Sequence, residues 1–188
     1  MATYQTQGII LKKTDQGEAD QLFSIYTLEK GKVLALGRGT KKISSKLNCH
    51  LQSFAILQLL IASGKNYDHL AGVVIAKNFT EVKNDLKKIV LASFGLELVE
   101  KLTKVDQPDP NIFNLLVKYF EAINNHQFSD PEWQVVRHGF AVKFLTLLGL
   151  APKAEVVTNI NKLNTFLKNH LDSELQTDKF LAKISHTT

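Results

Sequence analysis

The sequence predicts an α+β protein, with a β-rich domain at residues 1–78 followed by an all-α domain at residues 79–188. Two patterns indicate this division. Short apolar runs separated by glycine turns fill the first 80 residues, and apolar residues then recur at helical spacing. Hydrophobic residues make up 44% and charged residues 22% of the chain, a balance that excludes a mostly disordered protein.

Five segments of the β-rich domain are expected to form strands. Polar or glycine-containing connections separate them, such as the loop at residues 14–20 and the tight turn at Glu29–Gly31. The run at residues 54–62 fits a helix as well as a strand on periodicity alone. Five short strands at this spacing predict a small sandwich or barrel, and the five-stranded barrel of this size is the oligonucleotide-binding (OB) barrel. The expected strands span residues 8–13, 22–28, 32–38, 51–62 and 67–76.

The all-α domain is expected to contain five helices. Apolar residues from Val82 to Leu102 recur at three- and four-residue steps and form one wide apolar face. Asp109–Pro110 and Asp130–Pro131 each open a further helix, because aspartate accepts hydrogen bonds from first-turn amides and proline at the next position loses none. The expected helices span residues 82–102, 109–123, 130–148, 161–171 and 174–184.

Two features of the expected helices predict local contacts: a capping box at the start of the last helix and two glycines within helices. Ser173 and Gln176 have the spacing of a capping box for the last helix. Gly95 and Gly139 lie within helices, where glycine costs about 1 kcal/mol relative to alanine. We therefore expect close contact between helices at these two glycines.

The net charge of +5 is concentrated in the β-rich half. Residues 1–80 hold 10 Lys and Arg against 5 Asp and Glu, whereas residues 81–188 hold 13 of each. The stretch between Glu29 and Asp68 has no acidic residue. Such a one-signed stretch indicates an anionic partner such as nucleic acid, with a solubilising surface as the alternative. Its basic residues are Lys30, Lys32, Arg38, Lys41, Lys42, Lys46 and Lys65.

Motifs for enzyme catalysis are missing from the sequence. It contains no P-loop, no dinucleotide fingerprint, no Gly-x-Ser-x-Gly elbow and no metal-ligand spacing among its six histidines. The single cysteine, Cys49, rules out a disulfide framework and a cysteine-built metal site. The acidic residues Asp15, Glu18 and Asp20 indicate a solvated loop rather than a cation site. We therefore expect a binding protein that is not an enzyme and uses no cofactor or metal.

No segment resembles a signal peptide or a membrane span. Residues 1–8 are polar, and the longest apolar runs are too short to cross a bilayer. With one cysteine in the chain, we expect a soluble protein in a reducing, intracellular compartment, without a membrane partner.

The binding chemistry is expected around the third strand and the loop that follows it. Lys41, Lys42 and Lys46 lie beside Gly37 and Gly39, and glycines allow a loop to follow a phosphate backbone while lysines supply charge to it. Lys32 and Arg38 share the parity of Leu34 and Leu36, so the two charges are expected at the ends of a partly buried face. Base stacking on an aromatic side chain is possible, although most of the candidates are expected in the barrel core. These candidates are Phe23, Tyr26, Phe54 and Tyr67.

Several segments resemble, in order and spacing, the bacterial recombination mediator RecO family. The resemblance covers roughly residues 8–152. The matching segments are Gly8–Lys12, Gly17–Leu22, Glu29–Val33, Gly37–Lys42 with Ser45–Leu47, Leu51–Phe54, Leu96–Val99 and Phe144–Pro152.

The resemblance implies an N-terminal OB barrel, a helical C-terminal domain and a function in recombinational repair. RecO proteins bind single- and double-stranded DNA and anneal complementary strands. They contact the acidic tail of single-stranded-DNA-binding protein, pair with RecR and help to load the RecA recombinase at gaps. The implied location is the bacterial cytoplasm, in association with the nucleoid. No cofactor turns over in this work.

Candidate site residues follow from these expectations. The helical domain is expected to offer an apolar groove with a basic rim to an acidic peptide that ends in an aromatic residue. The candidates for this rim are Lys118, Arg137 and Lys143. The candidates for phosphate contacts are Lys30, Lys32, Arg38, Lys41, Lys42 and Lys46.

The sequence departs from the family pattern in one place, and two other functions stay open. Many RecO proteins carry a four-cysteine zinc module after the position of Pro152, but residues 153–188 contain no cysteine, so zinc is not expected. One alternative function is an OB-type module that binds RNA or acts in translation. The other is a small hydrolase that uses Cys49 as its nucleophile.

Overall fold

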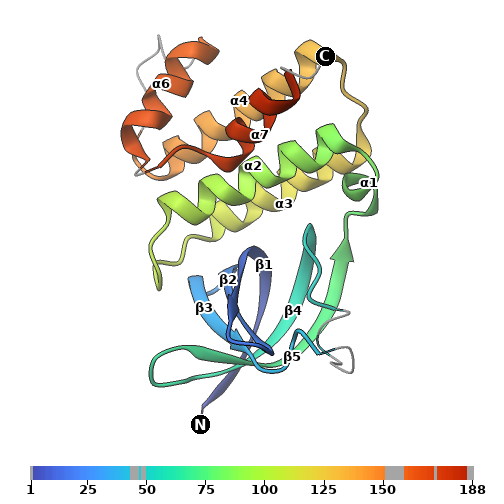
Figure 1. The fold of residues 1–188 in the computed structure, drawn as a ribbon. Coiled ribbons are helices and arrows are strands. Elements are labelled where there is room, and N and C mark those ends of the chain that lie inside the picture. Colours follow the sequence, from blue (N-terminus) through green and yellow to red (C-terminus); the bar gives the residue numbers. More distant parts are fainter. Residues whose placement is uncertain (1, 43–46, 48–49, 151–158, 172, 186–188) are drawn as a thin grey trace.

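In the computed structural model, the first half of the chain forms a closed five-stranded barrel, and helices are stacked on one end of it (Figure 1). The structure describes residues 2–42, 47, 50–150, 159–171 and 173–185. The expected α+β class, an OB barrel followed by a helical domain, is confirmed. Within the described part, no helix is long and apolar enough to cross a membrane.

The barrel strands are β1 (Thr3–Gln16), β2 (Asp20–Thr27), β3 (Gly31–Gly37), β4 (Ala55–Ala62) and β5 (Asp68–Asn78). They pair in the order β1-β2-β3-β5-β4, and β4 closes back onto β1. All pairs are antiparallel except a short parallel contact between β3 and β5. The expected loop at residues 14–20 is wrong, because β1 and β2 continue through it as a hairpin arm.

A β-bulge in β1 redirects the residues that follow it. The register between β1 and β2 shifts between Ile10 and Lys12, so Leu11 is the extra residue. Without the shift, Lys12 would share the inward face of Ile10, because side chains alternate along a strand. With the shift, Lys12 lies opposite Ser24, whose hydroxyl donates a hydrogen bond to Glu100 of the helical domain. The bulge therefore turns Lys12 toward the helices.

Two helices, α1 (Thr80–Lys83) and α2 (Leu86–Leu102), replace the single helix expected from residue 82 to residue 102. The break lies at Asp85, whose backbone is extended and whose carboxylate accepts hydrogen bonds from the amides of Lys87 and Lys88. An aspartate in this position begins a new helix. The remaining helices are α3 (Pro110–Asn125), α4 (Asp130–Leu147), α6 (Ile160–His170) and α7 (Gln176–Ser185).

The expected helix starts are confirmed at α3 and shifted at α4. Asp109 caps α3 by accepting a hydrogen bond from the amide of Asn111 at 2.8 Å. At α4 the N-cap is Ser129 rather than Asp130, because the amide of Ser129 donates to the Glu132 carboxylate at 2.8 Å. This bond and one from the Ser129 hydroxyl hold the pKa of Glu132 below its ordinary value.

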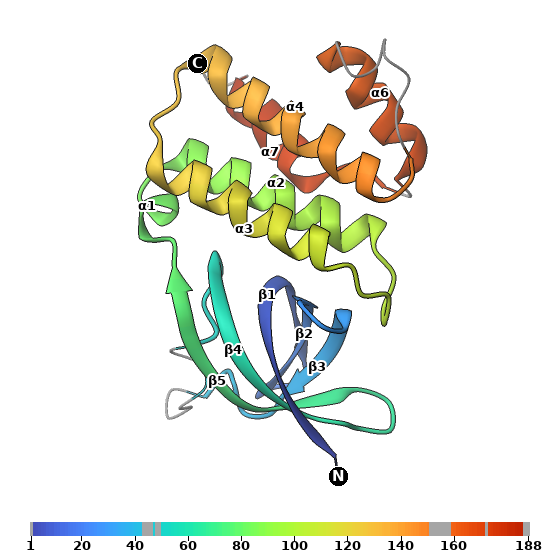
Figure 2. The ribbon, with the colours of Figure 1, turned by 180° about the vertical axis from the view of Figure 1, so that it is seen from behind.

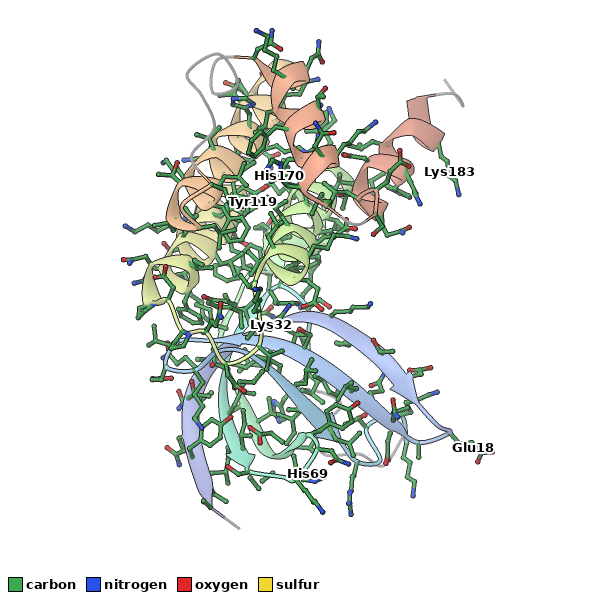
Figure 3. All side chains as sticks on the ribbon, turned by 90° about the vertical axis from the view of Figure 1, so that its left-hand side faces the viewer. Glu18, Lys32, His69, Tyr119, His170 and Lys183 are labelled. Atoms are coloured by element: carbon green, nitrogen blue, oxygen red, sulfur yellow. The ribbon has the colours of Figure 1, made fainter. Side chains whose placement is uncertain are left out.

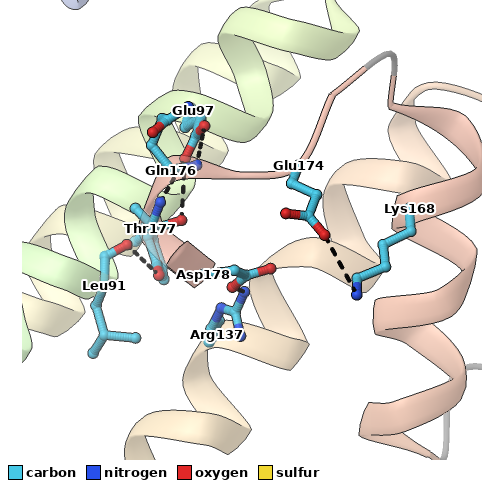
Figure 4. Close-up of polar contacts among 9 residues, drawn as sticks. Leu91, Glu97, Arg137, Lys168, Glu174, Gln176, Thr177 and Asp178 are labelled. Atoms are coloured by element: carbon cyan, nitrogen blue, oxygen red, sulfur yellow. Dashed lines mark hydrogen bonds and ion pairs between the residues drawn. The ribbon is translucent and has the colours of Figure 1, made fainter. Parts of the chain in front are cut away.

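The first turn of α7 is capped by another helix (Figure 4). The Glu97 carboxylate of α2 accepts hydrogen bonds from the amides of Gln176 and Thr177, at 2.7 and 3.1 Å. The expected capping box at Ser173 and Gln176 is wrong, because the Ser173 hydroxyl lies 2.5 Å from Nζ of Lys101. The cap of α7 thus comes from a residue about 80 positions away in the sequence.

The outer face of the barrel strands β1 and β2 packs into the hydrophobic core of the helical domain. Helices α2 and α3 lie directly over the barrel in both views (Figures 1 and 2). Ile9, Leu11 and Tyr26, on the outer face of β1 and β2, are buried with the apolar side chains of these helices, whereas the barrel interior forms a second cluster. The Tyr26 hydroxyl donates to the Asp109 carbonyl at 3.3 Å, and burial raises the pKa of Tyr26 to about 12.

The expected close contact is present at Gly95 and not at Gly139. A Cβ atom at Gly95 would lie 2.7 Å from Cε1 of Tyr119, whereas a Cβ atom at Gly139 would meet no atom within 4 Å. The Tyr119 ring cannot easily move away from such a Cβ atom, because its hydroxyl donates to the Leu91 carbonyl and the ring stacks on Phe140. Gly95 is therefore the position that sets the spacing of α2 and α3.

We predict opposite stability effects for alanine at these two glycines. Gly95→Ala should lower the free energy of unfolding by about 1–3 kcal/mol, because the added methyl overpacks a rigid contact. Gly139→Ala, the matched control, should raise it by about 0.4–1 kcal/mol, because alanine restricts the unfolded chain and meets open space. Urea denaturation measures both changes. A stabilising effect of Gly95→Ala would contradict the packing described here.

Candidate nucleic-acid interface

An exposed basic loop, defined as residues 38–42, follows β3. Arg38, Lys41 and Lys42 are exposed, whereas Thr40 is buried and anchors the loop through hydrogen bonds from its hydroxyl. Gly39 has a φ of +64°, a conformation that favours glycine. The loop therefore has a fixed base, and its three cations face solvent.

The hairpin arm, defined as residues 12–24, supports the basic loop from one side. The Asp20 carboxylate accepts a hydrogen bond from the amide of Gly39 at 2.7 Å, and the Ala19 carbonyl accepts one from the amide of Lys41 at 3.0 Å. Glu18 marks the protruding tip of this arm (Figure 3). The acidic residues that appeared as a solvated loop in the sequence thus include one that holds the basic loop in place.

Asp15 of the hairpin arm forms an ion pair with the basic loop. Its carboxylate lies 2.8 Å from Nζ of Lys41, and both side chains are partly exposed. Hydrogen bonds from Lys41 and then Gln21 hold the pKa of Asp15 below its ordinary value of 3.8. Because the folded-state pKa is depressed, this contact is fully present above pH 3.8 and is lost as the pH falls through the lower folded value.

The two other described cations of the predicted phosphate site, Lys30 and Lys32, lie at the far end of β3. Lys32 lies six residues before Arg38 and Lys30 lies eight residues before it, about 20 and 26 Å along an extended strand. Lys30 is exposed, and its Nζ lies 4.0 Å from the centre of the Tyr4 ring. The structure therefore divides the predicted cations between the two ends of one strand.

The expected exposure of Lys32 is wrong. Its side chain is buried between the barrel and the helices, with only 8% of the residue exposed, and its Nζ donates to the Glu100 carbonyl at 2.7 Å (Figure 3). The loop after α2 also covers this edge of β3, where the amide of Asp106 donates to the Lys32 carbonyl. Lys32 connects the two domains and is not available to a phosphate.

The other candidate residues of the β-rich half are Lys46, Cys49 and the four aromatic residues. Lys46 and Cys49 lie outside the described residues. Phe23 and Tyr26 are fully buried, which leaves Tyr67, 39% exposed, and the half-buried Phe54 as aromatic side chains with a surface.

The three candidate rim residues of the helical domain do not form one rim. Lys118 on α3 and Lys143 on α4 are exposed. Arg137 is largely buried, forms an ion pair with Asp178 of α7, and lies 4.1 Å over the ring of Phe94 (Figure 4). Residues 137 and 143 of α4 also point about 120° apart, because successive residues of a helix turn by 100°. The expectation that Arg137 is an exposed rim residue is wrong.

The sequence did not single out Lys12 and Lys13, which lie where the hairpin arm meets the helical domain. Nζ of Lys13 donates to the Leu51 carbonyl at 2.5 Å, and burial, followed by the nearby charge of Lys83, lowers the pKa of Lys13. The paired lysines are visible in the sequence, but the bulge that turns Lys12 toward the helices is not. Among the described residues, no group of three or more His, Cys, Asp or Glu side chains is arranged to hold a metal ion.

Both halves of the chain match models of one protein family. Residues 1–79 match the N-terminal domain of recombination protein O, and residues 83–157 match its C-terminal domain. The chain belongs to the RecO family. Helices α6 and α7 lie beyond the residues that the RecO models match.

Relatives named DNA repair protein RecO align with most of this chain. The protein of Halalkalibacterium halodurans is 28% identical over 152 residues, which are 81% of this chain and 58% of the relative. The protein of Dehalococcoides mccartyi is 28% identical over 159 residues, 85% of this chain and 61% of the relative. For Gloeothece citriformis the identity is 33% over 152 residues, with shares of 80% and 53%. The chain thus spans less than two thirds of the length of these RecO relatives.

We predict that Lys32 stabilises the fold. Lys32→Ala should lower the free energy of unfolding by about 1–3 kcal/mol, because it leaves the partly buried Glu100 carbonyl without its donor. The exposed Lys42→Ala should change stability by less than about 0.5 kcal/mol. Urea denaturation of both variants provides the comparison, and equal effects would argue against a structural role for Lys32.

Proposed function

We propose that this RecO-family chain binds DNA in recombinational repair and promotes the annealing of complementary single strands. The observation that carries the proposal is the exposed basic loop, with Arg38, Lys41 and Lys42 on an OB barrel, in a chain that belongs to this family. OB barrels bind single strands through a positively charged surface that follows the phosphate backbone. Similarity to the relatives named DNA repair protein RecO supports a role in DNA repair.

In the proposed mechanism, the cations of the basic loop bind phosphates and release counterions. Neutralised phosphates repel a second strand less strongly, so two complementary strands can approach each other. Contacts to the backbone leave the base edges free to pair. No covalent step and no cofactor take part, so we propose that the chain acts as a mediator and not as an enzyme.

The partners of this activity are also proposals. We propose contacts with the acidic tail of single-stranded-DNA-binding protein and with RecR, and through them the loading of RecA. For the peptide, the exposed Lys118 and Lys143 remain candidates, whereas Arg137 is already paired with Asp178. An acidic tail that used Arg137 would have to displace α7 from it.

We predict that annealing depends on the basic loop. Complementary oligonucleotides should anneal faster with the protein than without it, in the presence or absence of single-stranded-DNA-binding protein. Replacing Arg38, Lys41 and Lys42 by glutamine should reduce the log-log salt slope of single-strand binding by about 2, since each phosphate contact contributes about 0.7. Fluorescence anisotropy at several salt concentrations measures this slope.

The control variant removes the same charge elsewhere, by glutamine at the exposed Lys118, Lys143 and Lys179. Its salt slope should equal that of the unchanged protein. Absence of annealing in every condition would refute the proposed function, and tighter binding of RNA than of DNA would favour an RNA-binding module.

We predict that Asp15 restrains the basic loop. Asp15→Asn removes the carboxylate that competes with phosphate for Lys41, so affinity for single-stranded DNA should rise by up to about fivefold, the range of an exposed ion pair. Glu18→Gln, at the tip of the same arm, provides an equal charge change without this ion pair. If both variants raised the affinity equally, net charge and not the Asp15–Lys41 contact would explain the effect.

A further inference from the structure

A cleft of about 750 Å³ lies where the barrel meets the helical domain and is lined by residues of both. On the barrel side it is lined by Lys12 and Lys13 of β1 and by Phe54, which precedes β4. Lys101 of α2, Ser173 and the first residues of α7 line the opposite wall. We call this space the interdomain cleft. It contains none of the cations of the basic loop.

Two of the three lysines of the interdomain cleft donate hydrogen bonds to neutral groups. Lys13 donates to the Leu51 carbonyl and Lys101 to the Ser173 hydroxyl, each at 2.5 Å. Lys12 is exposed. In the part of the chain that the structure describes, none of these three lysines forms an ion pair. Their positive charge is therefore available to an anionic ligand.

Two carboxylates line the cleft, and both are already engaged. Glu97 accepts the amides at the start of α7, where the helix dipole compensates negative charge. Glu100 accepts the Ser24 hydroxyl, and the buried ammonium of Lys32 is bonded to its carbonyl. These contacts direct both carboxylates to donors within the protein, and three lysines outnumber the two carboxylates in the lining of the cleft.

Phe54 adds an aromatic surface to the cleft in an unusual backbone conformation. Its φ is +57°, a region that non-glycine residues with bulky side chains rarely adopt. Its ring packs edge-on against Phe120, with 6.2 Å between the centroids, and remains half-buried. Such backbone strain is often found where a side chain is positioned for a ligand.

The cleft and the basic loop both lie along the hairpin arm. Lys13 of the cleft and Asp15 share one face of β1, two residues and about 7 Å apart, and Asp15 contacts Lys41. OB barrels occupy about 4–16 nucleotides of a strand, a length sufficient to cover both regions. A single strand bound at the basic loop is thus long enough to reach the lysines of the cleft.

We propose that the interdomain cleft is a second contact region for the single strand that binds the basic loop. Phosphates bind Lys12, Lys13 and Lys101, and one base stacks on Phe54. The inference rests on the proposed function and adds a path for the strand from the barrel to the helical domain. Positive charge beside an aromatic ring, at the base of the hairpin arm that also contacts the basic loop, matches a polynucleotide.

The test removes two cleft charges while retaining hydrogen-bond donors. Lys12→Gln with Lys101→Gln should lower the log-log salt slope for a single strand of about 20 nucleotides by about 1.4, since two phosphate contacts are lost. Lys104→Gln with Lys179→Gln, two exposed lysines outside the basic loop and the cleft, is the matched control and should leave the slope unchanged. A short strand that covers only the basic loop should bind the cleft variant as tightly as the unchanged protein.

Phe54→Leu provides a second variant that keeps apolar volume in the core. It should weaken binding of the long strand by about fivefold or more, the effect of one lost stacking contact, without changing the salt slope. Thermal unfolding of each variant confirms that it is folded.

The outcomes separate the cleft from the proposed function. An unchanged slope in the Lys12 and Lys101 variant would overturn the cleft and leave the basic loop intact as a site. Loss of affinity for an acidic peptide in this variant, with unchanged DNA binding, would overturn it in favour of a peptide. No binding of single strands by the unchanged protein would overturn both proposals.

Discussion

The burial of the outer face of β1 and β2 in the core of the helical domain determines most of this structure. Ile9, Leu11 and Tyr26 belong to the strands of the barrel, yet they pack with the apolar side chains of the helices. Burying a side chain of this size contributes about 1.5–3 kcal/mol. The buried Lys32 adds a directional bond to Glu100. The barrel and the helical domain are therefore held in one relative orientation, and so are the surfaces of each that lie beside the interface.

This joint also explains how charge is distributed on the barrel. At the end of β3 near the helices, Lys32 is buried in the interface. At the other end, Arg38, Lys41 and Lys42 are exposed to solvent. The single extra residue at Leu11 turns Lys12 to the side of the helices. The excess positive charge thus lies in two basic regions along the hairpin arm, one at the loop after β3 and one where the arm meets α2.

Local patterns predicted the elements of the fold, and tertiary contacts decided the details of the site. Alternation and turn residues located the strands, and Asp109–Pro110 located the start of α3, because these signals act within a few residues. Parity placed Lys32 correctly on a face of β3, but whether another domain covers that face depends on residues 100–106. The N-terminal cap of α7 could not be predicted from the sequence for the same reason, because Glu97 lies on a different helix.

The cap supplied by Glu97 has a consequence for the order in which the helical domain forms. A helix of 10 residues such as α7 is too short to be stable alone in water. Its first amides find their acceptor only when α2 is already helical, and its Asp178 finds Arg137 only when α4 is in place. The last helix is therefore templated by earlier ones, and its amides should be among the first to exchange with solvent when the domain opens locally.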